Sequence, residues 1–362
     1  MSSLRADLHP AEIVPLPVSL LTGFLGAGKT TLLSRLLKDP DSGRLAVIIN
    51  EFGAVSLDHD LIESSDESDV IELQGGCLCC TIQGDLSRTI RGLYARMQRG
   101  EIPAFERVVI ETTGLADPAP ILKTIITDPM IAECFRLDGV ITVVDGINGA
   151  ATLDRHPEAQ RQVGVADRIV LSKTGDLDAD AVTALEARVQ TLNPGVPIVR
   201  TESASAAAVL EASLYDPVRG RVNVADCDHA FLDAQEHKHD HDHDHQHQHG
   251  HHHDHHHDVN RHSAAIRADC HVADQPMPFD RFLELFNLLQ AHAGENMLRV
   301  KGIFHIAERP EQPLVIHGVQ HVFHPLVWLH EWPSPDRRCR LVAITQDLDP
   351  TVITKLFKSL AG

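Results

Sequence analysis

The stretch Gly23-Phe24-Leu25-Gly26-Ala27-Gly28-Lys29-Thr30 decides the fold of this chain. It matches the pattern G-x-x-x-x-G-K-[ST], in which a glycine-rich backbone wraps phosphate groups and a lysine reaches the terminal phosphates. An apolar run, Val18–Leu21, precedes the motif, and a run with apolar residues at helical spacing, Thr30–Lys38, follows it. A strand before the loop and a helix after it are the context that this motif requires. The sequence therefore predicts a phosphate-binding loop rather than a chance glycine-rich turn.

Each residue of the motif has an expected role at a nucleotide. The glycines free backbone N–H groups to contact phosphate oxygens, and the start of the helix adds a partial positive charge. Lys29 is expected to reach the β- and γ-phosphates, and the Thr30 hydroxyl to bind Mg²⁺. The predicted nucleotide contacts of this loop are Gly23, Gly26, Ala27, Gly28, Lys29, Thr30 and Thr31.

Outward from the loop, short apolar runs alternate with helix-like runs. The apolar runs are Val18–Leu21, Leu45–Ile49, Val108–Ile110, Val140–Val144, Ile169–Leu171 and Pro197–Val199. The helix-like runs are Thr30–Lys38, Asp85–Gln98, Pro120–Ile126 and Asp180–Leu192. This alternation predicts an α/β fold of the P-loop NTPase class, with a mostly parallel sheet covered on both faces. Ligands of such sheets bind at the carboxyl ends of the strands.

The alternation stops after residue 222. Residues 223–263 are dominated by His, Asp and Gln and have no apolar face, so we expect a disordered linker. Beyond it, helices are predicted at Pro278–Ala291 and Pro350–Leu360, and strands at Leu298–His305, Leu314–Phe323 and Arg340–Thr345. The predicted organisation is a P-loop domain at 1–222, a His/Asp-rich linker at 223–263 and a small α+β domain at 264–362.

Composition excludes several classes of function. The 362 residues carry 32 Lys and Arg against 51 Asp and Glu, a net charge of -19, which disfavours binding to nucleic acid. No run of about 18 apolar residues occurs, so no membrane span is expected. The start of the chain lacks the pattern of a signal peptide, and the seven cysteines do not form a disulfide framework. We therefore expect a cytoplasmic protein with reduced thiols.

Two further segments fit a phosphate-sensing site. Glu111-Thr112-Thr113-Gly114 follows an apolar run, so Glu111 could bind Mg²⁺ through water or orient attacking water, and the Gly114 N–H could contact a γ-phosphate. Asn50-Glu51-Phe52-Gly53 follows the preceding run, where a switch segment or a simple turn cap would fit equally well.

Two clusters could bind metal. Cys77, Cys79 and Cys80 supply up to three soft thiolates, which suit Zn²⁺ and also Cu(I) or Co²⁺. No second cysteine pair closes the site, which favours loading and release over permanent binding. The 13 histidines between His237 and His257 could bind further ions without fixed geometry. Each cluster also has a simpler explanation. The cysteines could be small buried side chains, and the histidine tract could be a solvated linker that binds no metal.

Taken together, these segments resemble the CobW family of P-loop GTPases, which includes the zinc-regulated GTPase metallochaperones. The segments at Gly23–Thr30, Asn50–Gly53, Gly76–Cys80 and Glu111–Gly114, followed by Ser172-Lys173-Thr174, come in the order of that family. The resemblance continues near the C-terminus, at Gly318-Val319-Gln320-His321 and Trp332-Pro333. It implies GTP as the nucleotide, and it implies base contacts from Ser172, Lys173 and Asp176. The acid stands one residue later than in the family pattern, because Gly175 precedes it.

The predicted function is a GTP-binding and GTP-hydrolysing metallochaperone, with Lys29 and Glu111 as the catalytic candidates. It would bind a transition metal, zinc first and cobalt second, at the three cysteines and transfer it to a client metalloprotein. We expect slow turnover, since the sequence shows no evident arginine finger. Because the cysteines lie between the two phosphate-sensing segments, GTP should tighten metal binding and hydrolysis should release the metal.

Three other functions fit parts of the sequence. They are a cobalt chaperone for cobalamin biosynthesis, a non-enzymatic His-rich zinc store and an ATP-dependent small-molecule kinase that shares the P-loop. A homo-oligomer is compatible with each.

Overall fold

A computed structural model describes residues 15–50, 71–72, 82–175, 177–212, 215–216, 221–222, 266–292, 294, 296–320 and 322–361. Contacts divide these residues into two compact units that each draw on several parts of the chain. The first comprises described residues within Met1–Gly149, Ala166–Asp178 and Ile198–Arg221. The second comprises those within Ala150–Val165, Ala179–Pro197 and Val222–Gly362. The domain boundaries expected from the sequence, after residues 222 and 263, remain a prediction.

Seven strands of the described chain form the parallel sheet of the first unit, in the order β3-β2-β4-β1-β5-β6-β7. In sheet order they are β3 (Ile71–Glu72), β2 (Leu45–Asn50), β4 (Arg107–Thr112), β1 (Leu16–Gly23), β5 (Phe135–Asp145), β6 (Arg168–Ser172) and β7 (Ile198–Arg200). The central strand β1 pairs Leu20 with Ile110 on one side and with Val140 on the other. The predicted α/β class with a parallel sheet is confirmed.

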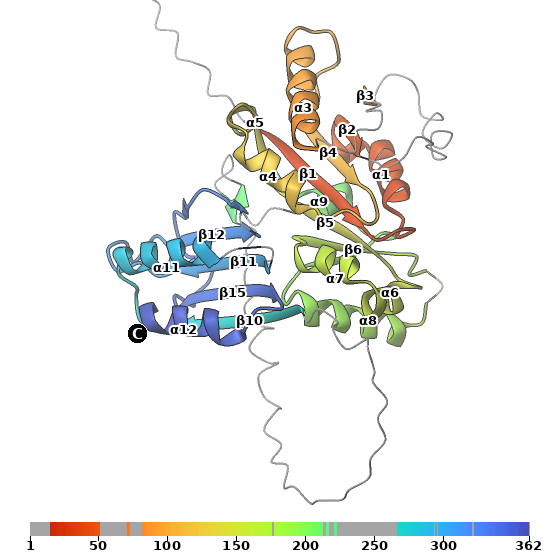
Figure 1. Cartoon of the computed structure of the whole chain (residues 1–362). Helices are drawn as coiled ribbons and strands as arrows, with labels where there is room; N and C mark the ends of the chain where they lie inside the picture. The colour runs from red at the N-terminus through yellow and green to blue at the C-terminus, as the bar shows by residue number, and fades with distance from the viewer. Residues whose placement is uncertain are drawn as a thin grey trace, which may run out of the picture. The chain divides into compact units, whose positions relative to one another are not determined.

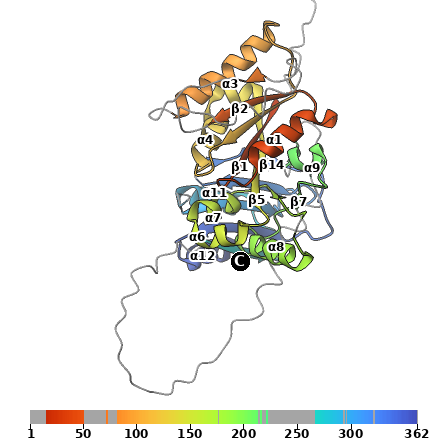
Figure 2. The ribbon, with the colours of Figure 1, turned by 90° about the vertical axis from the view of Figure 1, so that its right-hand side faces the viewer.

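Helices cover both faces of this sheet, which is why its strands are apolar on both sides. Helix α1 (Lys29–Lys38) and the short α9 (Ala206–Leu210) pack on one face, in a core that includes Leu33, Val109 and Val209. Helices α3 (Ile82–Gln98), α4 (Ala119–Thr127) and α5 (Pro129–Cys134) lie on the opposite face (Figure 1 and Figure 2). A single 3-10 turn, Pro40–Ser42, follows α1.

The carboxyl ends of parallel strands meet at one edge of a sheet, and here that edge gathers the motif residues. Strand β1 ends at Gly23 in the P-loop, β4 ends at Thr112 beside Glu111, and β6 ends at Ser172. Strand β5 ends there at Asp145, and β7 at Arg200. Segments that are far apart in the sequence are thus placed at one edge by strand direction alone.

In the second unit, the described strands form an antiparallel sheet in the order β10-β15-β11-β12-β13, with β14 paired to β12. Helices α11 (Phe279–His292) and α12 (Pro350–Ala361) cover one face through a core that includes Phe282, Phe304 and Phe357. The strands are β10 (Ile266–Ala273), β11 (Met297–Phe304), β12 (Leu314–Val319), β13 (Val322–Phe323), β14 (Val327–Trp328) and β15 (Cys339–Gln346). The predicted C-terminal α+β unit is confirmed.

Helices α7 (Pro157–Gly164) and α8 (Ala179–Leu192) pack against strands of this same sheet. A Cβ placed on Gly164 would lie 3.1 Å from Leu298 Cδ1, so helix and strand are in close contact. The fully buried Arg299 of β11 donates to the carbonyl of Val165 at the end of α7. Arg161 on α7 donates to the Gln346 side chain at 2.7 Å. The second unit therefore includes helices that precede residue 222 in the sequence.

Several elements were not anticipated from the sequence: β3, β10, β13 as a separate strand, β14, α5, α6 (Gly149–Arg155) and α7. Two short strands, β8 (Tyr215–Asp216) and β9 (Arg221–Val222), also pair with each other. The predicted linker at 223–263 lies outside the described residues. Within the described part of the chain, no helix combines the length and apolar character needed to cross a membrane.

Candidate nucleotide site

The loop between β1 and α1 has the backbone shape that its glycines predict. Gly26 and Gly28 have φ angles of 73° and 95°, a region that side chains with a Cβ rarely adopt. A Cβ on Gly23 would collide with the carbonyl of Val143 on β5, so this position requires glycine for space as well. The Ala27 amide donates to the Phe24 carbonyl at 3.1 Å, which closes the turn. The loop therefore leads directly into the first turn of α1.

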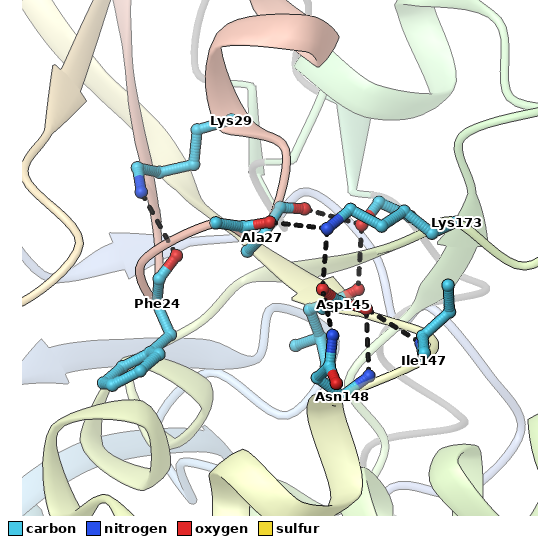
Figure 3. Close-up of polar contacts among 10 residues, drawn as sticks. Phe24, Ala27, Lys29, Asp145, Ile147, Asn148 and Lys173 are labelled. Atoms are coloured by element: carbon cyan, nitrogen blue, oxygen red, sulfur yellow. Dashed lines mark hydrogen bonds and ion pairs between the residues drawn. The ribbon is translucent and has the colours of Figure 1, made fainter.

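Lys29 is held inside this loop. Its ammonium group donates to the carbonyl of Phe24 at 3.3 Å (Figure 3) and to that of Gly23 at 2.9 Å. The residue is only 8% exposed. The loop carbonyls thus keep the cationic group at the carboxyl edge of the sheet. Thr31, which is also a predicted nucleotide contact, is exposed on the first turn of α1.

The structure brings Thr30 and Glu111 together, although 81 positions separate them. The Thr30 hydroxyl donates to Glu111 Oε1 at 3.0 Å, and Glu111 is buried at the end of β4. A hydroxyl and a carboxylate side by side are hard oxygen donors of the kind that Mg²⁺ takes in nucleotide sites. The chemistry of this pair therefore fits Mg²⁺.

The segment after Glu111 lies against the P-loop. The buried Thr112 hydroxyl donates to the Thr22 hydroxyl of β1 at 2.8 Å. A Cβ on Gly114 would lie 2.6 Å from the backbone nitrogen of Leu25, so only glycine allows this approach. The two predicted phosphate-contacting segments, around Gly23–Thr30 and Glu111–Gly114, are thus in direct contact.

Ser172 and Lys173, the predicted base contacts, bond to the other side of the P-loop. Ser172 Oγ donates to the Ala27 carbonyl at 2.6 Å, and Lys173 Nζ donates to the Gly26 carbonyl at 2.7 Å. Lys173 also pairs with Asp145 at 2.7 Å (Figure 3), and its backbone φ is 56°. Lys173 therefore links the ends of β5 and β6 to the phosphate-binding loop.

Asp145 is a site residue that the sequence analysis missed. Its Oδ1 accepts from the amides of Ile147 at 2.8 Å and Asn148 at 3.0 Å. Burial raises the pKa of Asp145, but the hydrogen bonds from Lys173, Asn148 and Ile147 outweigh burial, and the pKa is lowered overall. Its position directly after the apolar run Val140–Val144 was the signal that could have identified it.

Glu202 is a second missed residue. Its carboxylate accepts from the Thr174 amide at 3.0 Å and from the Thr174 hydroxyl at 2.8 Å. Burial raises the pKa of Glu202, but amide and hydroxyl donors from its own backbone, Thr174 and Gly175 outweigh it and lower the pKa. Glu202 lies two residues after the end of β7, so it too comes shortly after a strand of the parallel sheet.

Other predicted site residues lie outside the described part of the chain. They are Asp176, Glu51–Gly53 and the three cysteines Cys77, Cys79 and Cys80; of Asn50 only the backbone, at the end of β2, is described. Among the described residues, no group of three or more His, Cys, Asp or Glu side chains is arranged to bind a metal ion. The three cysteines predicted to bind zinc therefore take no part in the contacts described above.

A glycine-rich loop that joins a buried parallel strand to a helix and faces a carboxylate on the neighbouring strand defines a P-loop nucleotide-binding protein. Residues 17–200 match the family described as the CobW/HypB/UreG nucleotide-binding domain. Residues 266–361 match the C-terminal domain of the cobalamin synthesis protein CobW. The chain belongs to the CobW family.

Its relatives include proteins named as zinc chaperones. Over 96% of its length the chain is 32% identical to the zinc chaperone CobW of Pseudomonas aeruginosa, of which 92% is covered. It is 41% identical over 184 residues to the zinc chaperone YjiA of Escherichia coli, a match that spans 51% of this chain and 57% of YjiA. It is 33% identical over 199 residues to the zinc-regulated GTPase metalloprotein activator 1 of Schizosaccharomyces pombe, a match that spans 53% of this chain and 47% of that protein.

Among solved structures, the fold resembles the crystal structure of the Zn(II)-bound YjiA GTPase from E. coli. The TM-score is 0.66 at 25% identity, and the match covers 96% of this chain and 99% of that chain. The similarity therefore extends through both the parallel and the antiparallel sheet.

Proposed function

We propose that this protein is a GTP-hydrolysing metallochaperone that binds Zn²⁺ at Cys77, Cys79 and Cys80 and transfers it to a client protein under nucleotide control. The observation that carries the proposal is the 3.0 Å hydrogen bond between Thr30 and Glu111, which joins the P-loop to the β4 carboxylate. The relatives named as zinc chaperones, together with the YjiA GTPase, support the activity and the choice of metal.

At the phosphates, Lys29 neutralises charge on the β- and γ-phosphates, and Thr30 and Glu111 hold Mg²⁺ directly or through water. Bound Mg²⁺ supplies charge neutralisation at the phosphate oxygens. Glu111 also orients the attacking water by accepting a hydrogen bond from it. In hydrolysis the water oxygen bonds to the γ-phosphorus and the bond to the β–γ bridging oxygen breaks, which yields GDP and inorganic phosphate.

At the base, Ser172, Lys173 and Asp176 recognise guanine. The hydrogen bonds of the Lys173 ammonium group to Gly26 and Asp145 support this assignment, because they hold the Lys173 side chain beside the P-loop. A carboxylate from Asp176 would accept from the two ring-edge N–H groups that guanine has and adenine lacks. The preference for GTP over ATP follows from that difference.

The zinc ion is cargo rather than a resident cofactor. Three thiolates close together bind Zn²⁺ strongly, and Co²⁺ is the second metal that this ligand set suits. Thiolates of this kind require a reducing compartment, which is why we place the protein in the cytoplasm. The client is a metalloprotein that receives the ion when GTP hydrolysis changes the loops on both sides of the cysteines.

The experiment compares GTP and ATP turnover with and without Zn²⁺, and then measures Zn²⁺ affinity in two nucleotide states. The affinity is measured on a protein that lacks Glu236–Asp258, so that metal bound by the histidine tract does not contribute to the signal. We expect tighter Zn²⁺ binding with a non-hydrolysable GTP analogue than with GDP, by about 5- to 150-fold. Cys79→Ala and Cys80→Ala should abolish the difference.

Each step has an outcome that would reject it. Turnover of ATP alone would reject the GTPase, and no turnover of either nucleotide would leave a zinc store. Equal Zn²⁺ affinities in the two nucleotide states would remove nucleotide control, and unchanged binding in the cysteine variants would remove the thiolate site.

A further inference from the structure

The carboxylate of Glu202 reaches from the end of β7 to the loop after β6. It accepts two hydrogen bonds from one residue, the Thr174 amide at 3.0 Å and the Thr174 hydroxyl at 2.8 Å. Thr174 is buried, whereas Glu202 is exposed, so the contact closes the loop from its solvent side. A carboxylate that accepts from both donors of one residue fixes the orientation of that residue.

The other side of the same loop is fixed by the P-loop. Lys173, the residue before Thr174, donates to Gly26 and to Asp145, and Ser172 donates to Ala27. The φ of 56° at Lys173 turns the chain sharply between these contacts and Thr174. The segment at 172–175 is thus held by the phosphate-binding loop on one side and by Glu202 on the other.

The hydrogen bonds between Glu202 and Thr174 are not needed to hold the turn after β7 or to cap α9. The turn after β7 has its own bonds, because the Thr201 amide and hydroxyl both donate to the Leu171 carbonyl, at 2.8 and 2.9 Å. Helix α9 is capped by Ser205, whose hydroxyl accepts from the Ala208 amide at 3.2 Å. The bonds of Glu202 to Thr174 therefore constrain the loop after β6 rather than its own turn.

We infer that Glu202 is a positioning residue that sets selectivity for the nucleotide base by fixing the loop at 172–175. This inference rests on the proposed function, because it assigns base recognition to that loop. The insertion of Gly175 before Asp176 makes the constraint necessary, since glycine adds backbone freedom just where the recognising acid must be positioned. Glu202 reduces that freedom, because its carboxylate accepts hydrogen bonds from Thr174 and from the backbone of Gly175 itself.

The expected effect is confined to binding of the base. Without Glu202 the loop must be ordered by the nucleotide itself, which weakens binding of guanine nucleotides by about 3- to 10-fold. Phosphate contacts come from other segments, so adenine nucleotides, which gain nothing from the ordered loop, should bind as before. The ratio of GDP to ADP affinity should fall by the same factor, with kcat for saturating GTP changed by less than about 3-fold.

The test measures GDP and ADP affinities by calorimetry, and kcat and KM for GTP, in wild type, Glu202→Ala and Glu202→Gln. Glu101→Ala is the matched control, because it also removes one exposed carboxylate. Glu101 lies before β4, which begins at Arg107, whereas the site lies at the other end of that strand. Thr174→Val removes only the hydroxyl bond and should give a smaller loss than Glu202→Ala. Because that bond is already absent, the double variant should lose little more than Glu202→Ala alone.

The outcomes separate this inference from the proposed function. A wild type that binds GDP and ADP equally would overturn the proposed guanine selectivity and the inference with it. A wild type that prefers GDP, with an unchanged GDP-to-ADP ratio in Glu202→Ala and Glu202→Gln, would overturn the inference alone. An equal loss of affinity for both nucleotides would likewise reject it, because it would reveal general loosening of the site.

Discussion

The ammonium group of Lys29 lies 2.9 Å from the carbonyl oxygen of Gly23, the first residue of its own motif. Lys29 begins α1 and Gly23 ends β1, so the contact spans the entire loop. The cation is therefore already oriented toward the edge where phosphates bind, and a bound phosphate would compete with the carbonyl for the same N–H groups. A site arranged in advance loses little free energy to reorganisation when charge develops.

Replacement of Lys29 by Ala should reduce GTP turnover by about 100-fold or more, because a positioned cation at the transferring phosphate is lost. Turnover is measured as phosphate release at saturating Mg²⁺. Lys38→Ala is the control, since Lys38 is exposed at the end of the same helix. Equal turnover in wild type and Lys29→Ala would contradict the assignment of this loop to the γ-phosphate.

Glu111→Gln should separate binding from hydrolysis. The amide keeps an oxygen that can accept from Thr30, so the loop should stay in place, but the charge that attracts Mg²⁺ and orients water is lost. We expect kcat to fall by about 100-fold while GDP affinity falls much less, with a higher Mg²⁺ requirement. Glu106→Gln, an exposed site just before the same strand, should leave all three quantities unchanged. Full activity of Glu111→Gln would assign the role elsewhere.

Deletion of Glu236–Asp258 should reduce the number of bound metal ions and leave GTP turnover unchanged. A segment without apolar residues contributes almost nothing to a core, so the melting temperature in metal-free buffer should also hold. Bound metal is counted after dialysis, and a Gly/Ser segment of equal length serves as the control for chain length. A large drop in melting temperature would show that the tract has a structural role.

The stability of the first unit should fall as the pH falls below the ordinary pKa of Asp145, 3.8. In the folded chain this pKa is lowered, so the carboxylate stabilises the fold above the ordinary value, and the stabilisation is lost as protons bind. Asp145→Asn cannot titrate. The difference in melting temperature between wild type and Asp145→Asn should therefore shrink as the pH is lowered from about 4 to about 2. A constant difference over that range would contradict the argument.

Hydropathy predicted the centres of the strands but not their ends. The apolar run Val140–Val144 became β5, yet β5 begins at Phe135 and includes the charged residues Arg136 and Asp138 before that run. Asp138 is buried there because Arg107 and Arg136 both donate to its carboxylate. Such charged residues resemble a loop in the sequence, since one of the partners that neutralise Asp138, Arg107, lies on another strand.

The same limit explains what was missed elsewhere. Strand β10, Ile266–Ala273, mixes polar and apolar residues and is only partly buried, so it lacks an apolar run. At the site, Lys29, Thr30 and Glu111 were predictable because each belongs to a local motif with a known geometry. Asp145 and Glu202 were not, because their bonds to Lys173 and Thr174 join residues 28 positions apart. Only strand order shows that such residues meet.

The packing of α7 and α8 on the antiparallel sheet determines how the chain would respond to a break. A protease that cut within 223–263 would leave these two helices in one fragment and the strands they contact in the other. Arg299 would still donate to Val165, and Arg161 to Gln346, across the cut. The chain would be nicked without shedding its C-terminal part. Covalent continuity through the histidine tract is therefore not what keeps the last hundred or so residues attached.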